Sequence, residues 1–523
     1  MMQTNKKGCK ELLMQRMFLA IISIIAVQFF LVSCLFLITN LNTNYTSWFQ
    51  NTWTTITSFR MWSYFCVLAT VTFFHGIICS KSYSNTPPYL KSRFAKFCRI
   101  FTPQNILMGV LHIIISGLLV WLHLSVQGGT YNFLTTECTI IYGVCLMEEH
   151  YFLFLSGFWS GLYFFLKISI FRVNYLKFPI ISMSKFYRFK TELYTLLPSL
   201  MVKCVWPTLY YLIIYYFLGS YFRSVILFLA SAELENEPLN SIPRLINLPL
   251  IFHLWLYQLI FVLAIDSTYL LFNLHLTEWI PFEFKQSNVF SNDNSEVTLP
   301  EALSMDKIPI MRHLGYLDLV TMAQKDKARR SVLFSLSQPG GHPYNWNCIV
   351  ETCIGLIKKF SDELSAACVK YPEEIPSCTL NTAVLTKNID DELFIQQFIR
   401  VKWNNFLKYL LSKPLISYIF AISSLSVLSI SEDFYGIVLK DLPLIINTLL
   451  GLKQALDKLQ KLNIIVKKQE EDDEFIKQIL RSLCGTTKRS LYRIVINFEE
   501  YIQDLALEPG TMEQLHNFLA YRE

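Results

Sequence analysis

Six long runs of apolar residues dominate the first half of the chain, and each is long enough to cross a bilayer as a helix. A hydrocarbon core about 30 Å thick needs about 20 helical residues, because unpaired backbone groups cannot remain in lipid. The runs cover residues 17–39, 61–79, 106–124, 151–171, 204–222 and 248–274. The pattern predicts a six-span transmembrane domain over residues 1–276.

After residue 276 apolar positions are regularly spaced among charged ones. The Ser- and Asn-rich residues 286–300 indicate a linker, which we place at 277–300. From residue 301, spacings of three and four without sustained alternation predict helices. They are expected at 311–324, 346–367, 475–484, 487–505 and 511–521. We therefore predict an all-α fold: a polytopic membrane protein with six transmembrane helices, followed by a cytosolic α-helical domain, residues 301–523.

Residues 414–430 carry no charge and allow two interpretations. A seventh span would place the C-terminus on the other side of the membrane. The segment has only 17 residues, contains five serines and begins with Pro414, so it is short for a span. A buried core helix or a shallow membrane contact fits the segment better.

Residues 390–413 form an amphipathic helical pattern that ends before Pro414. Its apolar face can lie on a membrane surface or pack into a domain core, and such stripes more often pack into a core. The face consists of Ile395, Ile399, Trp403, Phe406 and Leu410.

A second apolar seam follows a helix start at Asp441 and Pro443, where Asp suits the cap and Pro the first turn. The seam consists of Leu442, Ile445, Leu449, Leu452, Leu456 and Leu459, at spacings of three and four. It covers fewer than three heptads, which is short for an independent coiled coil. We expect it to pack inside the domain rather than to form a dimer.

Charge adds an orientation to this picture. The chain is 53% hydrophobic and only 16% charged, against roughly 25% charged in an average soluble domain. Residues 1–276 contain 19 basic and 9 acidic residues, and 16 of the basic residues precede the first span or lie between spans two and three or four and five. The other connections contain only three. Because cytosolic loops retain positive charge, both termini are predicted to be cytosolic.

Two features of the expected lumenal loops agree with this orientation. Asn44 opens an Asn-Tyr-Thr tripeptide, a possible glycosylation site. Cys138 and Cys145 could form a disulfide in an oxidising compartment, and free thiols are the alternative.

Ionisable residues inside the spans are candidates for transport or catalysis. They are His75, His112, His123, His253 and Asp266. His123 and Asp266 lie near span ends, where the interface can solvate them, and the other histidines can be neutral and hydrogen-bonded to a neighbouring helix. No paired carboxylates accompany them, so the structural interpretation is favoured. The alternative is an endoplasmic-reticulum transporter or lipid-modifying enzyme with a cytosolic regulatory domain.

The run Phe-Ser-Leu-Ser-Gln-Pro-Gly-Gly-His-Pro-Tyr-Asn-Trp, residues 334–346, contains the strongest turn signal in the second half. Its glycines are not followed by the Gly-Lys-Ser/Thr of a phosphate loop, and no acid orients His342 for catalysis. A rigid buried turn is the expected structure, with Asn345 capping the next helix. Without a Cys-x-x-Cys pair or a strongly basic patch, we expect no catalytic site, cofactor, metal or direct nucleic-acid contact.

Six spans with cytosolic ends, followed by this run, resemble the Ndc-type transmembrane nucleoporins of animals. The residues of the run that carry the resemblance are Phe334, Ser337, Gln338, Pro339, Gly340, Gly341, His342, Pro343 and Trp346. Similar stretches recur along most of the chain, including residues 148–153, 252–256, 316–319 and 515–523.

The resemblance implies a non-enzymatic scaffold that anchors the nuclear pore complex in the nuclear-envelope bilayer and takes part in pore assembly, and thereby in nucleocytoplasmic transport of protein and mRNA. Its expected location is the pore membrane, and the resemblance implies that residues 301–523 form a cytosolic or pore-facing domain that binds partners. The implied partners are other nucleoporins: Aladin, and the linker nucleoporins that carry a membrane-binding helix.

Overall fold

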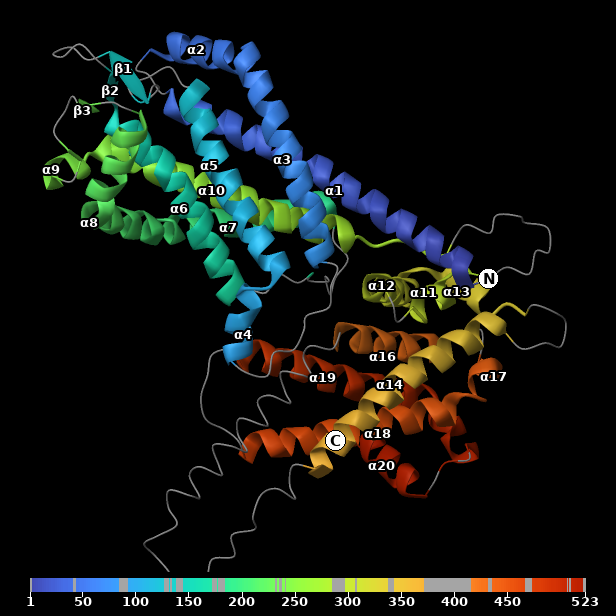
Figure 1. Ribbon diagram of the computed structural model, residues 1–523. Coiled ribbons are helices and arrows are strands. Elements are labelled where there is room, and N and C mark those ends of the chain that lie inside the picture. The colour runs from blue at the N-terminus through green and yellow to red at the C-terminus, as the bar shows by residue number, and fades with distance from the viewer. Residues whose placement is uncertain are drawn as a thin grey trace, which may run out of the picture. The chain divides into compact units, whose positions relative to one another are not determined.

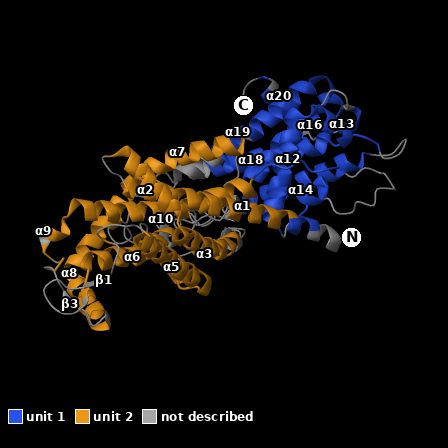
Figure 2. Cartoon of the chain, turned by 90° about the horizontal axis from the view of Figure 1, so that it is seen from above, with its two compact units in different colours: residues 1–11, 178–182, 278–523 blue, residues 12–177, 183–277 orange. Residues whose placement is uncertain are grey.

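The computed structural model describes residues 2–40, 44–83, 93–126, 131, 134–137, 144–171, 176, 184–230, 233–234, 238–239, 241–284, 297–305, 308–336, 343–370, 415–430, 435–465, 473–505, 507 and 509–520. Within these residues the chain is predominantly helical. It divides into two compact units, coloured in Figure 2. Unit 2 contains the described residues within 12–177 and 183–277, and unit 1 those within 1–11 and 278–523.

Six segments of the described chain are long and apolar enough to cross a membrane. Each of the six predicted runs overlaps one of them. The segments lie in α1 (Met2–Thr39), α3 (Phe59–Tyr83), α5 (Pro103–Val126), α6 (Glu148–Phe171), the pair α7 (Lys185–Lys203) and α8 (Val205–Ala230), and α10 (Leu248–Leu276). The fifth segment is longer than predicted because it includes α7. The start of α7 is basic and amphipathic, so the apolar run in the sequence begins only near α8.

Short elements occupy the connections between these helices. They are α2 (Tyr45–Thr57), α4 (Arg93–Ile100), α9 (Ile242–Leu245) and a small sheet of β1 (Thr135–Glu137), β2 (Val144–Leu146) and β3 (Glu233–Leu234). β2 pairs antiparallel with β1 and parallel with β3, so the sheet joins two expected lumenal connections. Figure 1 shows α2, the sheet and α9 at one end of unit 2 and α4 at the other. This separation agrees with connections that alternate between two sides of a membrane.

The closest helix pair in unit 2 is α5 and α6, and glycines permit its approach. A Cβ atom added to Gly161 would lie 2.6 Å from the backbone oxygen of His112 and from Cα of Ile113. One turn earlier, a Cβ atom on Gly157 would lie 3.0 Å from the backbone oxygen of Ser116. Small residues four positions apart let two membrane helices bring their backbones together, which replaces hydrophobic driving force with van der Waals contact.

Unit 1 is an all-helical bundle in its described part. Its helices are α11 (Leu299–Leu303), α12 (Pro309–Lys325), α13 (Lys327–Leu333), α14 (Tyr344–Lys370), α16 (Leu415–Ser429), α17 (Tyr435–Val438), α18 (Leu442–Ile465), α19 (Asp473–Asn497) and α20 (Pro509–Leu519), with a 3-10 turn η3 (Glu499–Asp504). α16 packs against α12, α14 and α19.

The two apolar segments of the second half are core helices. Most residues of α16 are buried, including Phe420, Ile422 and Leu425, so the core interpretation of residues 414–430 is confirmed over 415–429. In α18 all six seam residues from Leu442 to Leu459 are at most 1% exposed. α18 packs against α14 and α19, and the burial of its seam confirms the prediction of packing within the domain.

Three local expectations are wrong in detail. The helices expected at 475–484 and 487–505 are joined in one helix, α19, which continues through Gly485 and ends at Asn497, and the 3-10 turn η3 follows. α14 begins at Tyr344, so Asn345 lies inside the first turn and is not the cap. The expected linker begins with packed structure, since Phe282 and Phe284 are buried and Glu283 forms a β-bridge with Thr298.

Candidate membrane anchor and docking unit

The candidate spans present large apolar side chains on their outer faces. In α8 alone, Phe217 is 71% exposed, Tyr221 66% and Phe228 85%. In water, such a continuous apolar surface would cause association. In a bilayer it meets lipid tails, so the arrangement is that of a lipid-embedded bundle.

The intramembrane histidines lie among aromatic rings. His75 and His112 face each other with ring centroids 5.1 Å apart, and His112 Nδ1 is 2.7 Å from the carbonyl oxygen of Met108 on its own helix. His253 Nδ1 similarly contacts the carbonyl oxygen of Pro249. The expected bonds to neighbouring helices are therefore replaced by bonds within the helix, because the carbonyl four residues earlier is within reach of the ring.

The expectation that His123 is solvated at the membrane interface is wrong. His123 is fully buried, and its ring lies 4.5 Å from that of Phe36 and 5.1 Å from that of Tyr257. Asp266 is partly exposed within α10. Among the described residues no group of three or more His, Cys, Asp or Glu side chains could hold a metal ion.

A buried carboxylate joins three parts of unit 2 at the end that carries the small sheet. Glu148 Oε1 accepts hydrogen bonds from the hydroxyl of Tyr215 at 3.0 Å and from Arg223 at 3.1 Å. Its Oε2 accepts the backbone N–H of Leu239 at 2.9 Å. All partners of this charge are fixed by the fold, so it holds α6, α8 and the connection before α10 together.

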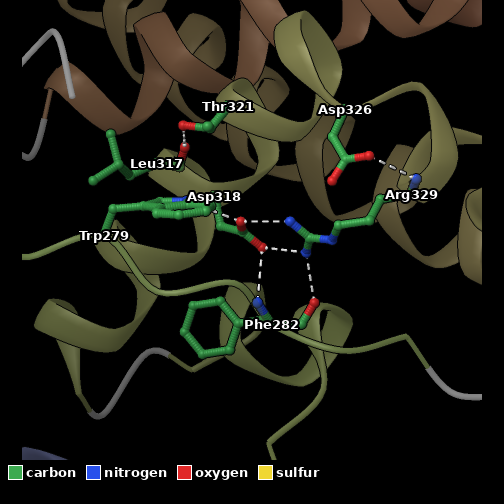
Figure 3. A network of polar contacts seen from close by, with 7 residues as sticks. All are labelled: Trp279, Phe282, Leu317, Asp318, Thr321, Asp326 and Arg329. Atoms are coloured by element: carbon green, nitrogen blue, oxygen red, sulfur yellow. Dashed lines mark hydrogen bonds and ion pairs between the residues drawn. The ribbon is translucent and has the colours of Figure 1, made fainter.

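A second buried carboxylate organises unit 1. Asp318 of α12 is 0% exposed and pairs with Arg329 of α13 through two hydrogen bonds, at 2.9 and 2.7 Å (Figure 3). It also accepts the indole N–H of Trp279 and the backbone N–H of Phe282, both at 3.0 Å.

The guanidinium completes this ring of contacts. Arg329 donates to the carbonyl oxygen of Phe282 at 2.6 Å, and Asp318 raises the pKa of Arg329. The side chain of Asp326 caps α13 by accepting the backbone N–H of Arg329. Within unit 1, the network therefore fixes residues 279–284 onto α12 and α13.

The signature run, residues 334–346, has a buried aromatic residue at each end. Phe334 is 2% exposed and Trp346 0%, and their rings lie 4.8 Å apart. The indole N–H of Trp346 donates to Asp441 at 2.9 Å, which connects the run to the start of α18. Ser337, Gln338, Pro339, Gly340, Gly341 and His342 lie outside the described residues. The flanking Leu336 and Tyr344 are 51% and 50% exposed.

Other sequence-based sites have these positions. Ile395, Ile399, Trp403, Phe406 and Leu410 lie outside the described residues. Cys145 is disulfide-bonded, whereas Cys138, the partner considered for it, lies outside them. Asn44 is exposed and stands at the N-cap of α2.

His313 predicts a pH-dependent stability of unit 1. Burial, assisted by the charge of Arg312, lowers its pKa from 6.5 to about 3, and its Nδ1 shares a hydrogen bond with the Ser417 hydroxyl. The folded state therefore keeps His313 neutral. The contribution of His313 to the free energy of unfolding is complete above pH 6.5 and is lost as the pH falls toward 3, because protonation then favours the unfolded state. Thermal unfolding of the wild type and His313→Gln should show a shallower acid decline in the variant. Equal slopes would contradict this assignment.

The orientation of the chain predicts the accessibility of position 44. The Asn44→Cys variant is placed in microsomes with the cytosolic face outward and treated with an impermeant maleimide. Labelling in excess of that of the parent chain should occur only after permeabilisation. In wild type, a glycosidase-sensitive mass shift that Asn44→Gln abolishes would be a second sign of a lumenal loop. Labelling of the introduced cysteine before permeabilisation would overturn the topology.

Comparison with known proteins identifies relatives along the whole chain. The family model for the nucleoporin protein Ndc1-Nup matches residues 11–397 and 395–516. Human Nucleoporin NDC1 is 30% identical over 327 residues, which cover 61% of this chain and 48% of the human protein. The mouse protein of the same name is 31% identical over 308 residues, which cover 57% of this chain and 45% of its own length.

A fly relative extends the match. Nucleoporin Ndc1 of Drosophila melanogaster is 21% identical over 573 residues, with 97% of both chains covered. The chain spans about half the length of the mammalian relatives that it matches. Because the family model covers most of both units, the resemblance seen in the sequence is confirmed, and the chain belongs to the Ndc1-Nup family of nucleoporins.

Proposed function

We propose that this chain is a membrane-anchoring scaffold nucleoporin. In this proposal unit 2 holds it in the nuclear pore membrane with both termini on the cytosolic or pore side, and unit 1 recruits soluble nucleoporins during pore assembly. The observation that carries the proposal is one family match that extends over a bundle of candidate spans and a separate helical unit.

The polar contacts of unit 2 support an anchor. Glu148 is satisfied by Tyr215, Arg223 and the backbone of Leu239, so this charge is engaged in holding helices together. The intramembrane histidines are packed among rings. The basic connections can also attract anionic headgroups, at about 1 kcal/mol for each basic residue near the surface.

Unit 1 supplies the docking surface in this proposal. Phe334 and Trp346 are buried in its core. Leu336 and Tyr344, which belong to the same signature run, are exposed. Exposed apolar side chains of this kind are suited to partner contacts. The family resemblance suggests Aladin and the membrane-binding linker nucleoporins as the partners.

Affinity purification of the tagged full chain tests this assignment. Wild type should retain other nucleoporins, and a Leu336→Asp, Tyr344→Asp chain should lose most of them while remaining in the membrane fraction. Lys359→Asp, which changes an exposed position of α14, is the control and should behave as wild type. Full retention by the double variant would exclude these two residues from docking, and recovery of no nucleoporins with wild type would contradict the proposed function.

A further inference from the structure

α2 is a short helix between two candidate spans. The first candidate span ends at Thr39 and the second begins at Phe59. α2 contains 13 residues and no charge, and it consists of four aromatic residues, one Ile and the polar residues Thr, Ser, Asn and Gln. The short connections at both of its ends keep it close to the surface from which the two spans emerge.

One face of α2 packs against unit 2. The indole N–H of Trp48 donates to the carbonyl oxygen of Leu37, near the end of α1, at 2.9 Å. Thr52, one turn later, is 2% exposed. α2 also contacts α3. These contacts fix the rotation of the helix about its axis.

The adjoining face is aromatic and uncovered. Tyr45 is 80% exposed, Phe49 62% and Trp53 60%. They recur every four residues and therefore lie within about 80° of rotation around the helix. The rings of Phe49 and Trp53 are stacked with centroids 6.4 Å apart. The exposed polar residues Gln50 and Thr54 lie farther around the helix.

The aromatic face continues into the next span. Phe59 is 86% exposed and Trp62 55% at the start of α3. Tyr and Trp are enriched where a bilayer meets water, because their rings are apolar while their O–H and N–H groups need polar partners. An uncharged helix with one aromatic face, tethered beside span ends, has the composition of an interfacial helix.

We propose that α2 binds a lipid surface: it lies in the headgroup region of the membrane leaflet opposite the N-terminus, with Tyr45, Phe49 and Trp53 inserted among the lipids. The proposal rests on the membrane-spanning part of the proposed function and adds a lipid-binding element to it. It gives the expected lumenal face of the protein a contact with the bilayer beside the spans.

Fluorescence quenching in nanodiscs tests the proposal on the full chain. The lipid is phosphatidylcholine brominated on its acyl chains near the headgroup. The Trp53 signal is obtained by subtracting the emission of Trp53→Phe from that of wild type, and the Trp48 signal by subtracting that of Trp48→Phe. Bromolipid should quench the Trp53 signal several-fold more than the Trp48 signal, which comes from the face packed against protein.

Quenching by iodide in the aqueous phase reports the contrary result, namely exposure of the tryptophan to water. If iodide quenches the Trp53 signal and bromolipid does not, α2 faces water or awaits a protein partner, and the proposal is wrong. Should Trp53→Phe fail to fold, Phe49→Trp and Gln50→Trp in the wild-type chain give the same comparison, with lipid quenching expected at position 49 and iodide quenching at 50. Bromolipid quenching of the Trp62 signal reports membrane insertion separately, so failure of this proposal remains distinguishable from failure of the anchor.

Discussion

Replacement of Gly161 by leucine is expected to prevent unit 2 from assembling. The added Cβ alone would lie 2.6 Å from backbone atoms of His112 and Ile113, and backbone cannot rotate away as a side chain can. Overpacking costs typically about 1–3 kcal/mol and more where the neighbour is rigid. Because α5 and α6 form the closest pair in the bundle, their separation should expose the buried histidines and the Glu148 site.

The measurement is thermal unfolding and size-exclusion behaviour of the purified full chain in detergent. Gly161→Ala should already lower the midpoint, and Gly161→Leu should aggregate. Gly76→Ala is the matched membrane control, since the three atoms nearest to its Cβ would all belong to the side chain of Ile21, the closest at 3.0 Å, and a side chain can shift. In Gly355→Ala the added Cβ meets nothing within 4 Å, so this variant should be slightly stabilised, because alanine is the better helix former. A stable, monodisperse Gly161→Leu chain would show that α5 and α6 do not approach in this way.

Replacement of Asp318 by asparagine is expected to destabilise unit 1 by about 1–3 kcal/mol, which is the usual cost of leaving buried hydrogen-bonding groups without a partner. The cost lies below that of breaking a fully buried ion pair, because the Arg329 side chain is 22% exposed to water. The variant leaves Arg329 without its bidentate partner and weakens the bonds from Trp279 and Phe282. The segment after α10 should then detach from α12 and α13.

Chemical denaturation of the full chain measures the loss of stability. Limited proteolysis of the folded chain, with cleavage detected within residues 279–284, measures the detachment of the segment. Asp362→Asn makes the same chemical change at an exposed position of α14 and should be neutral. An Asp318→Leu, Arg329→Met chain should recover part of the lost stability, because it removes both charges together. Wild-type stability of Asp318→Asn would mean that the pair contributes little to the fold.

The spans and core seams could be predicted because their signals are local. Each of the six runs is apolar for long enough to require a helix in lipid, and the seam from Leu442 to Leu459 repeats with the helix period. The lack of charge in residues 414–430 was ambiguous alone. Only the packing of α16 against α12, α14 and α19 distinguishes a core helix from a seventh span over 415–429.

The decisive polar contacts could not be predicted from spacing. Asp318 and Arg329 are 11 residues apart, but the Trp279 contact spans 39 positions and the Glu148–Arg223 pair 75. Glu148 and Arg223 lie in two different connections between predicted spans, and no spacing in the sequence marks them as partners. Their pairing depends on how α6 and α8 pack, which a single sequence does not encode locally.

Short elements were missed for a different reason. α2 lies in a connection whose Thr and Asn content is typical of a loop, and its aromatic positions carry no helix signal strong enough over 13 residues. Gly157 and Gly161 form a small-residue pair four positions apart, a signal available in the sequence that indicates close helix packing.

The central claim is that this chain is an anchor of the nuclear pore membrane, and its location in cells tests that claim most directly. The full chain, tagged at its C-terminus and expressed from its own locus, should form a punctate nuclear rim that coincides with a soluble nucleoporin. It should remain in the membrane fraction after high-salt extraction. A uniform reticular or plasma-membrane pattern, with no enrichment at the rim, would contradict the account.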